Sequence, residues 1–151
     1  MTVKDFGNRS VAIGTRDEAA AIQRGDGQPV FAIVNLSRVA AAAPWVQVPE
    51  FLFPLWDEDS HDCRGVGVQA AHTTAWLLDQ AGNATVLVCC GEGRSRSPLI
   101  AACALHMDDP RRGTIVEILE EIAALRTGVN VRGLDADWKR NIATACTVGG
   151  P

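Results

Sequence analysis

Residues 85–98 read TVLVCCGEGRSRSP, and this stretch decides the fold. Its first part, Thr85–Cys89, is a continuous apolar run rich in β-branched side chains, which is typical of a strand covered on both faces. Gly91 and Gly93 then predict a tight turn, and Pro98 suits an early position in a helix. The stretch therefore predicts a buried strand, a glycine-rich loop and the N-terminus of a helix.

The segments around this stretch alternate between the patterns of strands and helices. Further strands are expected at Val11–Gly14, Val30–Leu36 and Phe51–Trp56, the last of them at an edge because of Pro54. Helices are expected at Arg16–Arg24, Val66–Ala81, Ser97–His106, Thr114–Arg126 and Asp135–Ala145. This alternation predicts an α/β fold with a central, mostly parallel sheet of four to five strands flanked by helices. Ligands of such sheets bind beyond the carboxyl ends of the strands.

Two of the predicted helices carry apolar residues that should face the core. In the helix at 66–81 these are Trp76, Leu77 and Leu78. In the helix at 114–126 the apolar residues repeat at helical spacing, namely Ile115, Ile118, Leu119, Ile122 and Leu125.

Composition narrows the class of protein. The chain has 151 residues, of which 47% are hydrophobic and 21% charged, so a single folded domain over residues 1–151 is expected. Its net charge of −4 argues against general nucleic-acid binding, which relies on a basic surface. Five cysteines, an odd number, do not suggest a secreted disulfide framework. With no signal-peptide pattern and no run long enough for a membrane span, a cytoplasmic location is expected.

The glycine-rich loop has the residue types of a phosphate site. Gly91 and Gly93 let successive backbone N–H groups point inward, and the helix that follows adds its positive end. Arg96 offers a rigid fork for two phosphate oxygens. Beneath these donors the Cys90 thiol would be held as a thiolate. The loop therefore predicts a nucleophile facing a bound phosphate or sulfate-like anion.

Residues 86–98 resemble the signature of the cysteine-dependent protein tyrosine phosphatases, most closely that of the dual-specificity branch. That signature resembles Val-x-Val-His-Cys-x-x-Gly-x-x-Arg-Ser-Pro, and this chain departs from it at Cys89, where the family has histidine. The segments 13–15 and 33–36 look like the opening segments of the family. Residues 100–126 look like its helical pair after the loop.

The resemblance implies a phosphomonoester hydrolase that forms a phosphocysteine on Cys90. Arg96 would hold the phosphate oxygens and Ser97 would help the thiolate to leave. In the family the general acid lies on an upstream loop, which makes Asp57 in Pro-Leu-Trp-Asp the candidate here, with Asp59 as its rival. The substrate-binding loop would comprise Gly91, Glu92, Gly93, Arg94, Ser95 and Arg96. The resemblance implies no metal or other cofactor, and the expected partner is a phosphorylated substrate, in the first place a phosphoprotein.

Three alternatives stay open. A phosphoinositide, lipid-phosphate or RNA 5′-phosphatase would use the same chemistry, and Arg94 would favour a second anionic group whereas Glu92 would oppose it. A pseudophosphatase would keep the pocket without turnover, and Cys89 in place of the histidine favours that alternative. Cys89 itself is interpreted as a packed strand residue, or else as a redox partner of Cys90.

Asn35, at the end of its strand, is a candidate for bracing the loop.

Overall fold

A computed structural model describes residues 2–6, 9–41, 48–55, 63–91, 96–126, 128–129, 134 and 136–149. Its strands are β1 (Thr2–Phe6), β2 (Arg9–Thr15), β3 (Ala32–Asn35), β4 (Glu50–Leu52) and β5 (Thr85–Cys90). Its α-helices are α1 (Arg16–Gln23), α2 (Cys63–Ala81), α3 (Arg96–Asp108), α4 (Ile115–Leu125) and α5 (Asp137–Cys146), with a 3₁₀ turn at Pro110–Arg112.

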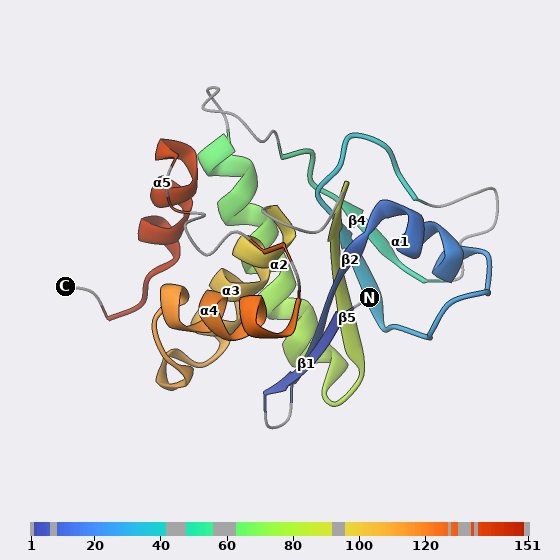
Figure 1. The fold of residues 1–151 in the computed structure, drawn as a ribbon, viewed down its shortest axis with the longest axis horizontal. Coiled ribbons are helices and arrows are strands. Elements are labelled where there is room, and N and C mark those ends of the chain that lie inside the picture. The colour runs from blue at the N-terminus through green and yellow to red at the C-terminus, as the bar shows by residue number, and fades with distance from the viewer. Residues whose placement is uncertain are drawn as a thin grey trace.

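The strands form one sheet in the order β1-β2-β5-β3-β4 (Figure 1). β2, β5, β3 and β4 run parallel, and β1 pairs antiparallel with β2 at one edge. The predicted α/β class with a mostly parallel sheet of four to five strands is confirmed. β5 is central, so Cys90 ends a strand that has neighbours on both sides: Thr15 pairs with Cys90, and Asn35 pairs with Cys89.

Helices cover the two faces of the sheet unequally. α1 packs on one face, whereas α2, α3, α4 and α5 gather on the other side (Figure 1). Along β5 the side chains alternate between the two cores: Val86, Val88 and Cys90 join the large cluster beneath the four helices, and Leu87 and Cys89 join the small cluster beneath α1. The period of two along an extended strand explains this division.

Local signals account for the boundaries of two helices. Thr15 is the N-cap of α1 and Thr114 is the N-cap of α4, and each forms a reciprocal capping box with the glutamate three residues later. Gly25, just after α1, has φ of 84°, a conformation that favours glycine.

Two side chains on the apolar patterns of α2 and α4 are exposed, and one strand was not expected. Trp76 is 57% exposed although Leu77 and Leu78 beside it are buried, because three successive helical residues span a wider arc than the face of α2 that meets the core. Leu125 is 51% exposed because α4 ends there and its C-cap residue Arg126 is already extended. β1 was not expected, since Lys4 and Asp5 are poor strand formers and its antiparallel pairing with β2 decides its conformation.

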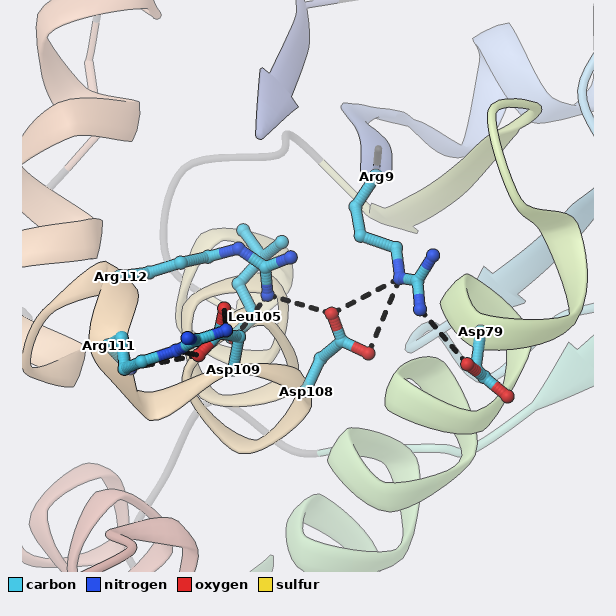
Figure 2. Close-up of polar contacts among 7 residues, drawn as sticks. All are labelled: Arg9, Asp79, Leu105, Asp108, Asp109, Arg111 and Arg112. Carbon is cyan, nitrogen blue, oxygen red and sulfur yellow. Dashed lines mark hydrogen bonds and ion pairs between the residues drawn. The ribbon is translucent and has the colours of Figure 1, made fainter. Parts of the chain in front are cut away.

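An ion-pair cluster holds the C-terminal end of α3 (Figure 2). The Asp108 carboxylate accepts from Arg9 Nε at 3.2 Å and pairs with Arg112 Nη1 at 2.8 Å. Arg9 also reaches Asp79 of α2, with 2.9 Å between Nη2 and Oδ1. These contacts join the start of β2 to the ends of α2 and α3. No helix in the described ranges is long and apolar enough to cross a membrane.

Candidate active site

Cys90 lies at the carboxyl edge of the sheet, where the sequence predicts the nucleophile. It is the last residue of β5, and its side chain faces the large core with 2% of the residue exposed. Its Sγ is 3.4 Å from the Oγ of Ser97, a fully buried residue in the first turn of α3. The strand and the helix thus bring together two of the predicted site residues.

Arg96 begins α3, and its guanidinium contacts two backbone carbonyls in the segments that follow β3 and β4. Its Nη1 donates to the Leu55 carbonyl at 3.0 Å and lies 3.5 Å from the Leu36 carbonyl. The Leu55 N–H in turn donates to the Leu36 carbonyl at 3.1 Å. A Cβ at Gly91 would lie 3.4 Å from Arg96 Nη2, so the guanidinium passes close to the first glycine of the loop. Arg96 and Gly91 are therefore near one another at the edge where Cys90 ends β5.

Several predicted site residues lie outside the described part of the chain. These are Asp57, Asp59, Glu92, Gly93, Arg94 and Ser95. Their roles stay predictions. Leu55, which accepts from Arg96, is two residues before Asp57 in the sequence. Arg96 is thus bonded to the segment that leads into the predicted acid loop.

Cys89 and Cys90 point to opposite faces of the sheet. Cys89 is fully buried on the side of α1. Burial, with smaller contributions from the neighbouring Cys90 and Glu50, raises the pKa of its thiol to about 12. Such a thiol is neutral and unreactive near neutral pH. This position agrees with the interpretation of Cys89 as a packing residue and places it away from the Cys90 sulfur.

Cys103, Cys146 and His106 are buried in structural contacts. Cys103 is fully buried and its thiol hydrogen-bonds with Cys146 of α5, which together with burial raises the pKa of Cys103. His106 is buried, and its Nδ1 lies 2.7 Å from the Gly113 carbonyl while its Nε2 accepts the Val148 N–H at 2.9 Å. His72 is exposed. Within the described ranges, no three His, Cys, Asp or Glu side chains gather as metal ligands would.

The backbone partners of Arg96 were missed by sequence reasoning. Leu36 and Leu55 contribute carbonyl oxygens rather than side chains, and any residue type supplies a carbonyl. No signal in the sequence marks such a contact. Only the strand order, which sets β3 beside β5 and β4 beside β3, brings these carbonyls to the arginine.

No protein-family model matches the sequence, and no curated protein is similar enough in sequence to match it. Solved structures are similar in fold. OH1 from the Orf virus, a tyrosine phosphatase with triple substrate specificity, superposes with a TM-score of 0.65 at 21% identity, covering 96% of this chain and 86% of OH1. Human DUSP28 gives a TM-score of 0.65 at 20% identity, covering 89% of this chain and 92% of that one.

A fungal structure is similar to the same degree. The Yvh1 phosphatase domain from Chaetomium thermophilum superposes with a TM-score of 0.64 at 14% identity, covering 95% of this chain and 92% of the domain. Likeness at such identities concerns the fold. The chain therefore shares the fold of these tyrosine and dual-specificity phosphatase structures.

Proposed function

We propose that this protein is a cysteine-dependent phosphomonoesterase of the dual-specificity type, with Cys90 as its nucleophile. The observation that carries the proposal is the junction of β5 and α3, where the Cys90 sulfur lies 3.4 Å from the Ser97 hydroxyl and Arg96 begins the helix. The fold shared with known phosphatases supports the same reaction class. The sequence motif over residues 90–97 supplies the remaining residue types of a phosphate loop.

The local electrostatics suit a thiolate at Cys90. The Ser97 hydroxyl can donate to the charged sulfur, and α3 directs the positive end of its dipole to this edge of the sheet. Arg96 adds a full positive charge. These groups would stabilise the anionic form of the sulfur and of a bound phosphate.

The first step is attack of the Cys90 thiolate on phosphorus. The S–P bond forms as the P–O bond to the leaving group breaks, while Arg96 and the amides of residues 91–95 hold the equatorial oxygens. Asp57 donates a proton to the departing oxygen, a contribution of on the order of 10²–10⁴ in rate. Asp59 is the alternative donor.

The second step is hydrolysis of the phosphocysteine. The carboxylate left at Asp57 takes a proton from water as that water attacks phosphorus, and the S–P bond breaks. The Ser97 hydroxyl stabilises the Cys90 thiolate as it leaves. The products are inorganic phosphate and the resting enzyme, and no metal or other cofactor takes part.

Phosphoproteins are the proposed substrates, and the cytoplasm is the proposed location. Glu92 in the loop disfavours a strongly anionic headgroup near the phosphate, whereas Arg94 would attract one. A panel of phosphotyrosine, phosphoserine and phosphothreonine peptides, inositol phosphates and RNA 5′-phosphates decides between protein, lipid and RNA substrates. The highest kcat/KM on a phosphopeptide is expected; an inositol phosphate or RNA end as the best substrate would contradict this assignment.

Hydrolysis of an aryl phosphate by the wild type and by Cys90→Ser tests the activity. The wild type is expected to turn over, and the variant is expected to lose turnover while still binding vanadate in a calorimeter. A wild type that binds vanadate without turnover would instead identify a pseudophosphatase, the alternative that Cys89 at the histidine position favours. Undiminished turnover by Cys90→Ser would overturn the mechanism.

The acid is assigned by a matched pair of variants. Asp57→Ala is expected to slow the hydrolysis of alkyl phosphates far more than that of nitrophenyl phosphate, because only a poor leaving group needs the proton. Asp59→Ala serves as the control and should not change this dependence. The reverse pattern would transfer the role to Asp59.

A further inference from the structure

Asn35, the last residue of β3, is fully buried and uses both ends of its side-chain amide. Its Oδ1 accepts from the Ser37 N–H at 2.9 Å and from the Ser37 hydroxyl at 2.6 Å. Its Nδ2 donates to the Val39 carbonyl and to Glu50 Oε2, both at 3.0 Å. Because a carbonyl and a carboxylate can only accept from Nδ2, the amide of Asn35 is held in one orientation.

The bond from Ser37 fixes a peptide plane. The Ser37 N–H and the Leu36 carbonyl belong to the same rigid peptide unit and point in opposite directions. Asn35 Oδ1 holds the N–H side of that unit at 2.9 Å. The carbonyl side is thereby directed away from Asn35.

The Leu36 carbonyl points to the catalytic edge. It accepts the Leu55 N–H at 3.1 Å and lies 3.5 Å from Arg96 Nη1. The Leu55 carbonyl accepts a hydrogen bond from the same Nη1 at 3.0 Å. The two carbonyls thus form a paired acceptor for one amino group of the guanidinium, and the Leu36 peptide holds both members in place.

We propose that Asn35 is a positioning residue for Arg96, acting through the Leu36–Ser37 peptide and the carbonyls of Leu36 and Leu55. This role rests on the proposed function, because it concerns the alignment of the guanidinium that would grip the phosphate. A misaligned fork loses its two-point contact with the oxyanion even when its charge remains. Asn35 touches no substrate in this account and contributes only by orientation.

Gln23 offers a matched control within the same polar network. It is also a fully buried amide, and its Nε2 donates to the Val48 carbonyl at 2.9 Å and to Glu50 Oε1 at 3.2 Å. Its Oε1 accepts the Val48 N–H at 3.0 Å. Gln23 therefore shares Glu50 with Asn35, and its hydrogen bonds to described residues go to Val48 and Glu50 rather than to the Leu36–Ser37 peptide.

The test compares vanadate binding and aryl phosphate kinetics in Asn35→Ala, Asn35→Ser and Gln23→Ala. In Asn35→Ala, vanadate affinity and kcat/KM should both fall roughly 10- to 100-fold, the scale of a misplaced catalytic group. Asn35→Ser keeps a side-chain oxygen able to accept the N–H two residues on, so it should recover most of that loss. Gln23→Ala should lower the melting temperature about as much as Asn35→Ala and leave vanadate affinity near the wild-type value.

Three results would overturn the role of Asn35: unchanged vanadate affinity in Asn35→Ala, no recovery in Asn35→Ser, or an equal loss in Gln23→Ala. The side-chain NMR signal of Arg96, assigned with Arg96→Lys, adds a readout that needs no activity. It should move in Asn35→Ala and stay in Gln23→Ala. If the wild type bound no vanadate, the proposed function would fail, while this signal would still support or contradict the positioning of Arg96.

Discussion

The two ends of helix α3 use arginine in opposite ways. At the C-terminal end, Arg9 and Arg112 share the carboxylate of Asp108, and the side chains of all three are at most 13% exposed (Figure 2). At the N-terminal end, the described partners of Arg96 are two neutral carbonyls. Carbonyls orient a guanidinium without cancelling its charge, whereas a carboxylate neutralises it. One end of α3 is therefore an anchor, and the other keeps a positive charge for an anion.

Replacing the arginine at each end should give the largest contrast. Arg96→Lys keeps the charge but loses the fork, so kcat/KM for an aryl phosphate should fall roughly 10²- to 10³-fold. Arg112→Lys should leave kcat/KM near the wild-type value, because its role is to pair with Asp108. Steady-state kinetics on both variants check this contrast, which would be lost if the two variants were impaired equally.

Removing the hydroxyl beside Cys90 should have the next largest effect on activity. A hydrogen bond to a charged sulfur contributes about 1.5–3 kcal/mol, so Ser97→Ala should lower kcat roughly 10- to 100-fold. Slower breakdown of the phosphocysteine should appear as a burst of nitrophenol before steady state in stopped-flow traces. A variant with wild-type kcat and no burst would show that Ser97 only packs beneath the loop.

Neutralising the anchor should change stability and leave the chemistry intact. Asp108→Asn leaves two arginines of low exposure without their shared carboxylate, and the free energy of unfolding should fall by about 3 kcal/mol. Asp109→Asn is the neighbouring control, because Asp109 pairs with Arg111, whose side chain is 91% exposed, and it should cost much less. Urea denaturation measures both, and an equal loss would contradict the special place of Asp108.

A smaller effect concerns Cys89 and pH. Its pKa is raised from 9.0 to about 12 in the folded protein, so the unfolded chain loses this proton first as pH rises. Between about pH 8 and pH 10, loss of this proton in the unfolded chain should lower the free energy of unfolding by about 1.4 kcal/mol. This loss adds to the one that other titrating groups cause equally in the wild type and in the variant. Cys89→Ala should lack this part of the loss. Urea denaturation at the two pH values, with identical losses in wild type and variant, would contradict a neutral buried Cys89.

The two ends of α3 also differ in how much of them the sequence predicted. The strand, turn and helix around Cys90 were predictable because their signals are local: β-branched residues, glycines and an early proline follow one another within 14 residues (85–98). The capping boxes at Thr15 and Thr114 have the same local character. Strand order, by contrast, is a property of the whole chain. Strand order and the packing of helices on the sheet bring Arg9 to Asp108 across 99 residues and Leu36 to Arg96 across 60.

The sequence also predicted the burial of individual side chains poorly. Trp76 is apolar and stands beside two buried leucines, yet it is exposed because helical periodicity turns it away from the core. Cys89 and Cys90 are neighbours of one residue type, and the pleat of β5 gives one a place in the small core and the other a place near Ser97. Residue type thus predicts burial less well than the orientation of each side chain in its element.

Trapping of the covalent intermediate is the most direct test of Cys90 as the nucleophile. The wild type or Ser97→Ala should be mixed with an excess of aryl phosphate, quenched in acid within the first turnover, and digested for mass spectrometry. We expect one phosphate on the peptide that contains Cys90 and none on the same peptide of Cys90→Ser. Turnover with no phosphorylated peptide, or with phosphate on a residue other than Cys90, would contradict it.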